Sequence, residues 1–368
     1  MSYSFGIEEE YFLVDRTTMA VARKMPDGFF AAAKATLGEQ VTGEFLQSQI
    51  EIVTAPQTDM ATAAIDLRDL RRTLGAIAQT HGLAIIAAGT HPTAVWERSR
   101  QSVGERYDSV MDDLQMIGRR NMLCGMHVHV ELPEPDMRVD VMTRMLPHVP
   151  LFIALSTSSP FWRSQPTGLL GYRLAAYDEL PRTGLPELFK TKAEFDAYID
   201  ALVQAGVMPD ASYIWWALRP SLKHPTLELR APDVCTNVDD AIAIAALYRA
   251  VARSLSLNPR QNRNMNAITR AIVLENKWRA QRYGVRGSFA RIDGNGSITV
   301  ADLLELVIAE VTPDAEALGC LDAMLQCRRI VEQGTSADRQ IAIFEPFADN
   351  PEHGLRQVSE WLAEATVS

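Results

Sequence analysis

Four short segments of the chain alternate polar and apolar residues with a period of two, which is typical of strands that bury one face. In residues 5–14, Glu8 and Glu10 fall on one face, and the opposite face is apolar except for Glu9. Two carboxylates ~7 Å apart on one sheet face repel each other, and a divalent cation is the usual group that stabilises such a pair. The first segment therefore predicts a strand that presents a metal clamp.

The three other segments carry their charged, imidazole or amide side chains on one side. These are Gln47, Gln49 and Glu51 in residues 47–53; His127, His129 and Glu131 in residues 125–132; and Glu228 and Arg230 in residues 226–230. If the four strands share a sheet and their apolar faces pack on helices, the opposite face becomes a catalytic floor. That floor would gather Glu8, Glu10, Glu51, His127, His129, Glu131, Glu228 and Arg230.

Apolar residues spaced by three and four predict a helix at 59–78, and Thr191 with Glu194 resembles a capping box that opens a helix at 191–205. Further helices are expected at 105–122, 139–156, 238–257 and 266–282. Arg106 and Arg119 in the helix at 105–122 are minor candidates for ligand contacts, because charges on helices mostly meet solvent. A buried strand is expected at 83–88, and a strand at 213–219 should pair with the Glu228 strand. The polar and aromatic stretch at 158–184 predicts a long binding loop.

The composition is that of an ordinary globular protein, with 368 residues, 47% hydrophobic and 22% charged. The polar strands extend from residue 5 to residue 230 without a linker rich in Gly, Ser or Pro, so a single domain over residues 1–368 is expected. The net charge of -10 argues against a general nucleic-acid or anionic-membrane surface. A nucleotide substrate remains compatible with it, because Mg²⁺ can lie between carboxylate and phosphate.

The four cysteines show no C-x-x-C spacing, which favours a reducing compartment. No segment approaches the ~20 apolar residues of a membrane helix, and the chain opens without a basic, then apolar, leader. We therefore expect a soluble, cytoplasmic protein. Residues 293–299 imitate part of a calcium loop but lack several of its oxygen ligands, so a plain Gly-rich turn is expected there.

Two side-chain patterns point to specific chemistry. His127 and His129 on one strand face are typical of zinc or iron ligands, so a hydrolase or oxygenase that uses them with a carboxylate is one interpretation. Arg230 would be a simple salt-bridge partner of Glu228 in isolation. Beside a carboxylate and metal floor, however, its guanidinium matches the oxygens of a transferring phosphoryl group.

Several motifs occur in a characteristic order along the chain. They are Gly6-Ile7-Glu8-Glu9-Glu10, Gly125-Met126-His127-Val128-His129-Val130, Ser159-Pro160-Phe161-Trp162, Gly171-Tyr172-Arg173 and Leu227-Glu228-Leu229-Arg230. The ordered set resembles the ATP-dependent carboxylate–amine ligases, specifically the YbdK-like type 2 glutamate–cysteine ligase group. The resemblance extends over most of the chain, through residues 275–280 and 282–284.

This resemblance implies an α+β, glutamine-synthetase-like fold in which an antiparallel sheet curves into a funnel with helices on its outer face. It implies that two or three Mg²⁺ ions bridge the ATP phosphates to Glu8, Glu10, Glu51, His127 and Glu228, with Glu44 as a further acidic position. Arg230 would contact the transferred phosphoryl group, with Glu51 and Glu228 as further catalytic residues. Arg173 would bind a substrate carboxylate, and the substrate-binding candidates beside it are Arg163 and Tyr172.

The implied reaction phosphorylates the γ-carboxylate of glutamate with ATP, after which the amine of cysteine or another amine displaces phosphate. His129, a nucleotide-binding candidate, departs from the classical glutamate–cysteine ligases and leaves the acceptor open. A non-catalytic binding relative of such a ligase is a third interpretation, and the apolar helices late in the chain are compatible with a homodimer.

Overall fold

The computed structural model describes residues 2–102 and 104–368, and within these ranges the side chains of Arg98, Glu105 and Arg106 are not described. In this part of the chain the main sheet has seven strands, and every pairing in it is antiparallel. The strand order is β2-β3-β1-β5-β9-β8, and β4 also pairs with β1. The strands are β1 (Phe5–Asp15), β2 (Val41–Gly43), β3 (Gln49–Val53), β4 (Leu83–Ile86), β5 (Met126–Glu131), β8 (Leu218–Pro220) and β9 (Thr226–Leu229).

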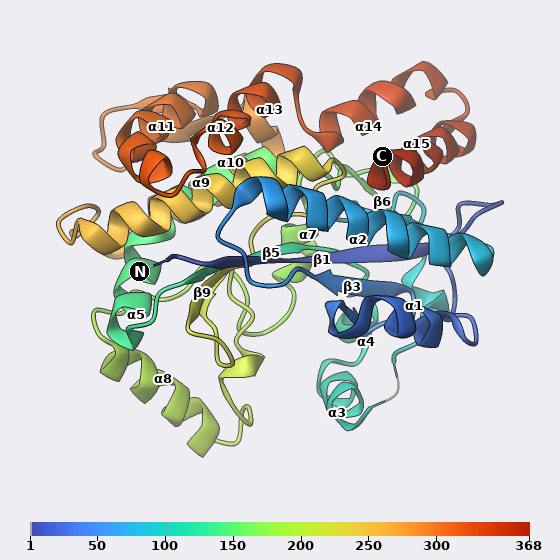
Figure 1. The fold of residues 1–368 in the computed structure, drawn as a ribbon, viewed down its shortest axis with the longest axis horizontal. Coiled ribbons are helices and arrows are strands. Elements are labelled where there is room, and N and C mark those ends of the chain that lie inside the picture. Colours follow the sequence, from blue (N-terminus) through green and yellow to red (C-terminus); the bar gives the residue numbers. More distant parts are fainter. Residues whose placement is uncertain (1, 103) are drawn as a thin grey trace.

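Helices cover the apolar face of the sheet, as the alternation of residues predicts. Figure 1 shows α2 and α9 lying along this face, with the C-terminal helices stacked above them, while α1, α3, α4 and α8 lie on the other side. The helices are α1 (Phe29–Leu37), α2 (Met60–Thr80), α3 (Glu105–Leu114), α4 (Met116–Arg119), α5 (Pro135–Met145), α6 (Val149–Ser156), α7 (Tyr172–Tyr177), α8 (Lys192–Gln204), α9 (Val238–Leu257), α10 (Ala267–Tyr283), α11 (Val300–Ala317), α12 (Leu321–Leu325), α13 (Cys327–Gln333), α14 (Ser336–Phe344) and α15 (Pro351–Thr366).

Glu9 is the polar residue on the apolar face of β1, and a fully buried ion pair accommodates it. Arg71 of α2 donates to both carboxylate oxygens of Glu9, at 2.8 Å from Nε and 2.6 Å from Nη2. The same guanidinium donates to the backbone carbonyls of Cys235 and Thr236, each at 2.7 Å. A buried charge needs such complete pairing. Glu9 therefore joins β1, α2 and the segment after β9.

Two predicted strands are shorter in the structure. Of residues 213–219, Leu218 and Arg219 alone belong to β8, because the backbone N–H groups of Trp215 and Ala217 donate to the carbonyls of residues 182 and 184. The predicted strand 83–88 ends at Ile86 because the Ala87 N–H donates to the Thr366 hydroxyl at 2.9 Å and so leaves the ladder. The antiparallel pairing of β8 with β9 is confirmed.

Two predicted helices are interrupted. Residues 105–122 form α3 and α4, separated at Gln115, whose φ of 50° cannot continue a right-handed helix. Residues 139–156 form α5 and α6, which are separated by a 3-10 turn at Leu146–His148. Pro147 in this turn and Pro150 in the first turn of α6 supply no backbone N–H. The binding loop predicted at 158–184 contains β6 (Phe161–Trp162), β7 (Gln165–Pro166) and α7.

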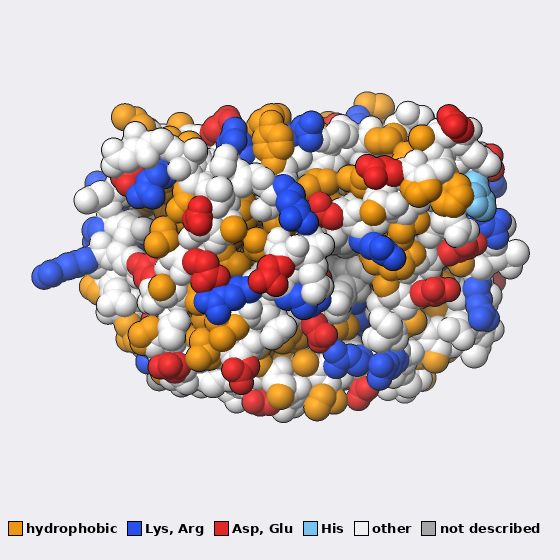
Figure 2. All heavy atoms as spheres, turned by 90° about the horizontal axis from the view of Figure 1, so that it is seen from above, with side chains coloured by type: hydrophobic (Ala, Val, Ile, Leu, Met, Phe, Trp, Pro, Cys, Tyr) orange, Lys and Arg blue, Asp and Glu red, His pale blue; other side chains and the backbone are white. Residues whose placement is uncertain are grey.

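The remaining sequence predictions on local structure agree with the structure. Residues 293–296 form the turn between β10 (Ser288–Ala290) and β11 (Ser297–Thr299), and the cysteines are all free and buried. Among the described residues, none of the helices is both long and apolar enough to cross a membrane. Figure 2 shows the helical side of the molecule, where acidic, basic and apolar side chains are interspersed.

Candidate functional site

A cavity of about 780 Å³ lies on the polar face of the sheet, opposite the face that carries Glu9. The strand register explains why polar residues from distant segments meet in it. Glu8 is paired across the strands with His127, and Glu10 with Glu51. On the other side of β5, His129 is paired with Glu228. Antiparallel partners point to the same face, so all these side chains line one cavity.

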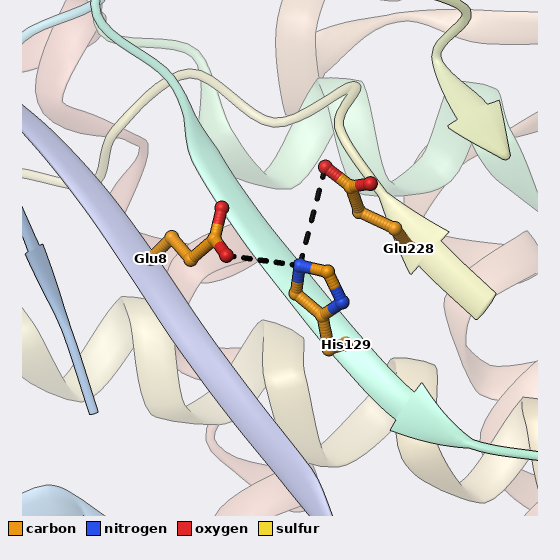
Figure 3. Close-up of side chains that lie close together, drawn as sticks. All are labelled: Glu8, His129 and Glu228. Atoms are coloured by element: carbon orange, nitrogen blue, oxygen red, sulfur yellow. Dashed lines mark ion pairs between the residues drawn. The ribbon is translucent and has the colours of Figure 1, made fainter. Parts of the chain in front are cut away.

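The first group in the cavity contains two histidines held by carboxylates. Glu8 contacts His127 Nδ1 and His129 Nε2, each at 3.1 Å. Glu228 lies 4.0 Å from His129 Nε2, and Figure 3 shows the two carboxylates on either side of this imidazole, from β1 and β9. One ligand atom from each of Glu8, His129 and Glu228 falls within 4.8 Å of the others, and the same holds for Glu8, Glu51 and His127.

The charges of this group compensate one another. Burial acts to raise the pKa of Glu8, but hydrogen bonds from His127 and His129 hold it well below its ordinary value. Burial lowers the pKa of His127, and the nearby charge of Arg230 lowers it further. For His129, burial is outweighed by the hydrogen bond to Glu8 and the charge of Glu228, so the pKa of this imidazole is raised.

Glu228 is held by two arginines. Arg219 of β8 donates to it from Nε at 2.7 Å, and the Arg230 guanidinium forms a close ion pair with it. These two charges depress the pKa of the buried Glu228 carboxyl well below its ordinary value, against the opposing effect of burial. The pairing of Arg230 with Glu228 was considered from the sequence. Arg219 was missed, because its role depends on the cross-strand register that places it opposite Glu228.

The second group is an acidic triad of Glu10, Glu44 and Glu51, whose oxygens lie within 4.8 Å of one another. Among the described residues, no Lys or Arg forms an ion pair with any of the three. Burial and the charge of Glu10 raise the pKa of Glu44 to about 8. Burial and the charges of Glu44, Glu8 and Glu10 raise the pKa of Glu51 well above its ordinary value.

The donor set of the triad fits a hard divalent cation such as Mg²⁺, which prefers oxygen ligands. Two hydrogen bonds already occupy some of the carboxylate oxygens. The Gly125 N–H donates to Glu10 at 2.6 Å, and the Thr42 hydroxyl donates to Glu51 at 3.0 Å. The raised pKa values of Glu44 and Glu51 show that three buried carboxylates cannot all be ionised here without help, which is the condition a bound cation relieves.

Arg173 is a buried residue of the cavity lining, and most of its guanidinium is hydrogen-bonded to the backbone. Nη1 donates to the carbonyls of Ala231 at 3.3 Å and Pro232 at 3.1 Å, while buried Nε has no partner among the described residues. The guanidinium also packs against Gly125, where a Cβ would lie 2.1 Å from Arg173 Nη2. A larger residue than glycine at position 125 would displace it.

Four residues singled out from the sequence lie outside the cavity lining. Arg163 pairs with Glu97 at 3.1 Å, and the Tyr172 ring packs on Trp162 at 5.5 Å between centroids. Glu131 accepts hydrogen bonds from Ser2 and Ser4, because the end of β5 extends beyond β1. Its expected place on the floor is therefore wrong, while the substrate roles of Arg163 and Tyr172 stay predictions. Arg119 is exposed, and the side chain of Arg106 lies outside the described residues.

The cavity also contains residues that the sequence analysis did not assign to the site. They include Phe45, Tyr107, Val110, Leu114, Asn121, Tyr177, Trp215, Lys223 and His224. All of them lie on loops, on short helices or next to strands rather than in the alternating strand segments. Tertiary packing brings them to the cavity, so the alternation within the strands holds no signal for them, although Tyr177 falls in the binding loop predicted at 158–184.

Comparisons with known proteins place the chain in a family. Residues 4–359 match the model of the family described as Glutamate-cysteine ligase family 2 (GCS2). The chain is 54% identical over 366 residues to a protein of Bradyrhizobium sp. (strain ORS 278) named "Putative glutamate--cysteine ligase 2", covering 100% of this chain and 88% of that protein. A protein of the same name from Rhodospirillum rubrum is 43% identical over 347 residues, which is 93% of this chain and 89% of that protein.

Two solved structures are similar in fold. The crystal structure of glutamate–cysteine ligase from Francisella tularensis in complex with AMP matches with a TM-score of 0.73 at 14% identity, covering 99% of this chain and 89% of that chain. A bifunctional glutathione synthetase from Pasteurella multocida matches with a TM-score of 0.72 at 15% identity, covering 98% of this chain and 52% of that chain. These matches confirm the predicted α+β, glutamine-synthetase-like fold.

Proposed function

The chain belongs to glutamate–cysteine ligase family 2, a family of ATP-dependent carboxylate–amine ligases, and from this premise we propose that it forms an amide between the γ-carboxylate of glutamate and an amine. One observation carries the proposal: two groups of carboxylates and the Arg230 guanidinium line the same cavity. The similar fold of the Francisella ligase, whose structure contains AMP, supports ATP as the nucleotide.

Magnesium is the cofactor that we propose for this site. Glu10, Glu44 and Glu51 would hold one ion, and Glu8, His127 and Glu228 would supply ligands for further ions. When bound, Mg²⁺ would neutralise the charge of the triphosphate and align it for transfer, as phosphoryl transfer requires. His129, with its Nε2 between Glu8 and Glu228, is proposed to contact the nucleotide together with Arg230.

The residues of the chain have distinct roles in the proposed reaction. A γ-carboxylate oxygen of glutamate attacks the γ-phosphorus of ATP, the bond to the leaving ADP oxygen breaks, and an acyl phosphate forms. Arg230 neutralises the transferring phosphoryl, while Arg219 holds Glu228 in place. The amine nitrogen then attacks the acyl carbon, the carbon–oxygen bond to phosphate breaks, and the nitrogen loses a proton to give the amide. No covalent bond to the enzyme is needed.

Arg173 is proposed to bind the α-carboxylate of the amino-acid substrate. Its place in the cavity lining and its unpartnered Nε support this role, although its Nη groups already donate to the backbone after β9. The substrate would be held by a guanidinium that the protein orients beforehand, which lowers the entropy lost on binding. Arg163 and Tyr172 are proposed as outer contacts of the same substrate.

The geometry supports the ligase over a zinc- or iron-dependent hydrolase. Glu228, which like Glu8 lies near both histidines, is already paired with Arg219 and Arg230. Two guanidinium groups next to a metal site favour an anionic phosphate substrate. A hydrolytic zinc or iron site would instead need an open coordination position for water. The chain would act as one catalytic domain, in the cytoplasm where ATP is available, and a homodimer stays a prediction.

Release of ADP from MgATP in the presence of glutamate and an amine tests the proposal. We expect Glu10→Gln and Arg230→Ala to abolish this release while the far-ultraviolet circular dichroism spectrum stays that of the wild type. Arg328→Ala is the matched control, because Arg328 is an exposed residue that pairs with Glu305 away from the cavity. Wild-type turnover by both cavity variants would refute the proposed site, and turnover without any carboxylate would indicate an ATPase instead.

A further inference from the structure

The motif at residues 159–162 lies outside the described lining of the cavity, but its first residue is bonded to the segment that carries Arg173 into the cavity. Ser159 is fully buried. Its N–H donates to the carbonyl of Leu170 at 3.0 Å, and its carbonyl accepts from the N–H of Tyr172 at 3.1 Å. The motif thus fixes the backbone that enters α7.

The side chain of Ser159 supplies the cap that the start of α7 lacks. The N-cap residue of α7 is Gly171, which has no side chain to accept from the first N–H groups of the helix. The Ser159 hydroxyl instead accepts from the N–H of Arg173 at 2.9 Å. It donates in turn to the Asp233 carboxylate at 2.6 Å. Because a hydroxyl has one hydrogen, this bond leaves its lone pairs free to accept from Arg173.

Asp233 is a buried residue of the segment after β9, and its carboxylate has little room to move. The oxygen that accepts from Ser159 also accepts from the N–H of Ser158 at 3.0 Å. The same oxygen lies close to Gly89, where a Cβ would be 2.6 Å away. The position of the Ser159 hydroxyl is therefore set by a carboxylate that is itself fixed.

The side chain of Arg173 returns to the segment that contains Asp233. Its guanidinium donates to the carbonyls of Ala231 and Pro232, the two residues before Asp233. Arg173 is therefore held to one segment at both ends, by its backbone through Ser159 and by its guanidinium directly. The carbonyl partners are neutral, and among the described residues no carboxylate forms an ion pair with Arg173. Its charge stays available for an anionic group of a substrate.

We propose that Ser159 and Asp233 are positioning residues for Arg173, and that they hold its guanidinium where it meets a carboxylate of the amino-acid substrate. The inference rests on the proposed function, in which Arg173 binds that carboxylate. Ser159 and Asp233 do not touch the substrate and act through Arg173. A misplacement of about 1 Å in such a group can cost about 100-fold in rate, so the loss of one link has a measurable effect.

Ser159→Ala removes the link to Arg173, and Ser158→Ala is the matched control. Both serines are fully buried, and each hydroxyl makes two hydrogen bonds. The hydroxyl of Ser158, however, contacts the backbone of Gly89 and Val234 rather than that of Arg173. The two variants should therefore lose similar stability. An effect on substrate binding that is confined to Ser159→Ala is then not a general effect of packing.

ADP release is measured with MgATP, glutamate and hydroxylamine, a small amine that traps acyl phosphates. We expect Ser159→Ala to raise KM for glutamate about tenfold, while kcat and KM for ATP stay within about twofold of the wild type. Ser158→Ala should leave kcat and both KM values within about twofold. An equal rise of KM for glutamate in both variants would overturn the inference. A fall in kcat in Ser159→Ala without a change in KM for glutamate would also overturn it.

A second set of variants shows whether Ser159 acts through Arg173. In an Arg173→Ala background, Ser159→Ala should raise KM for glutamate no further, because the group that it positions is absent. Asp233→Asn keeps an oxygen that can accept from the Ser159 hydroxyl, so KM for glutamate should rise less than about threefold. Additive effects of the Ser159 and Arg173 exchanges would overturn the inference, and so would an unchanged KM for glutamate in Arg173→Ala.

Hydrogen exchange of the peptide that spans α7, followed by mass spectrometry, tests the link without activity. Exchange should be at least about tenfold faster in Ser159→Ala than in the wild type or Ser158→Ala, because the Arg173 N–H loses its acceptor. Equal exchange would overturn the inference whatever the activity. Absence of ADP release from the wild type with every carboxylate and amine would instead refute the proposed function, and the exchange data would still decide whether Ser159 fixes Arg173.

Discussion

Glu9 and its two neighbours in the sequence should respond to mutation in opposite ways. Glu8 and Glu10 face the cavity, whereas Glu9 is fully buried among apolar residues and is neutralised by Arg71. Glu9→Gln removes a charge and leaves the guanidinium of Arg71 buried without a counter-charge, although its contacts to the carbonyls of residues 235, 236 and 366 remain. Glu9→Gln therefore tests whether the middle glutamate of the three is structural.

The expected loss of stability follows from the burial of the pair. Removing one partner of a buried ion pair typically costs about 3–5 kcal/mol, because the other charge stays desolvated. For a chain of 368 residues, the average unfolding entropy converts this loss into a fall of Tm by roughly 4–6 °C. The catalytic floor should be little affected, so ADP release at 25 °C is expected to stay within about twofold of the wild type.

Thermal unfolding followed by circular dichroism, together with the ADP-release assay, measures both effects. Glu305→Gln is the matched control, because it breaks an exposed ion pair with Arg328 and should change stability by less than about 1 kcal/mol. The reasoning would be refuted if Glu9→Gln lowered Tm no more than Glu305→Gln. It would also be refuted if Glu9→Gln abolished ADP release while Tm stayed unchanged.

Three further predictions concern the metal site, the substrate site and the dependence on pH. Glu44→Gln should remove the repulsion between Glu44 and its neighbours Glu10 and Glu51, so the Tm measured in EDTA should rise. The variant should also lose most of the increase in Tm that Mg²⁺ gives the wild type. An equal response to Mg²⁺ in both proteins would contradict the proposed site. Gly125→Ala should displace Arg173 and raise KM for glutamate at least about tenfold, while KM for ATP stays unchanged. A larger increase in KM for ATP than in KM for glutamate would place Arg173 on the nucleotide. Burial lowers the pKa of His148 to about 4 in the folded protein, against about 6.5 in the unfolded chain. Between these two pH values the unfolded chain binds more protons than the folded protein. The free energy of unfolding therefore falls as the pH drops through this window. The loss attributable to His148 at pH 5 is about 2 kcal/mol, which His148→Gln should remove in urea unfolding measured at pH 5 and pH 7.5.

Local patterns in the sequence were sufficient to predict which faces of the strands carry the chemistry. Side chains alternate with a period of two in every strand, so Glu8, Glu10, His127 and His129 had to share faces once their segments were recognised as strands. The same rule placed Glu9 on the opposite face but gave no partner for it. Arg71 lies on a separate helix, and its pairing with Glu9 depends on how α2 packs on the sheet.

The amino-acid sequence by itself determined the type of fold, the four polar strand faces and most of the charged residues that line the cavity. Tertiary structure alone decided the register that sets Arg219 opposite Glu228, the end of β5 that removes Glu131 from the floor, and the approach of α3 to Phe45. The physical reason is that side-chain periodicity is a property of each strand, whereas register and helix packing arise from contacts between segments far apart in the chain.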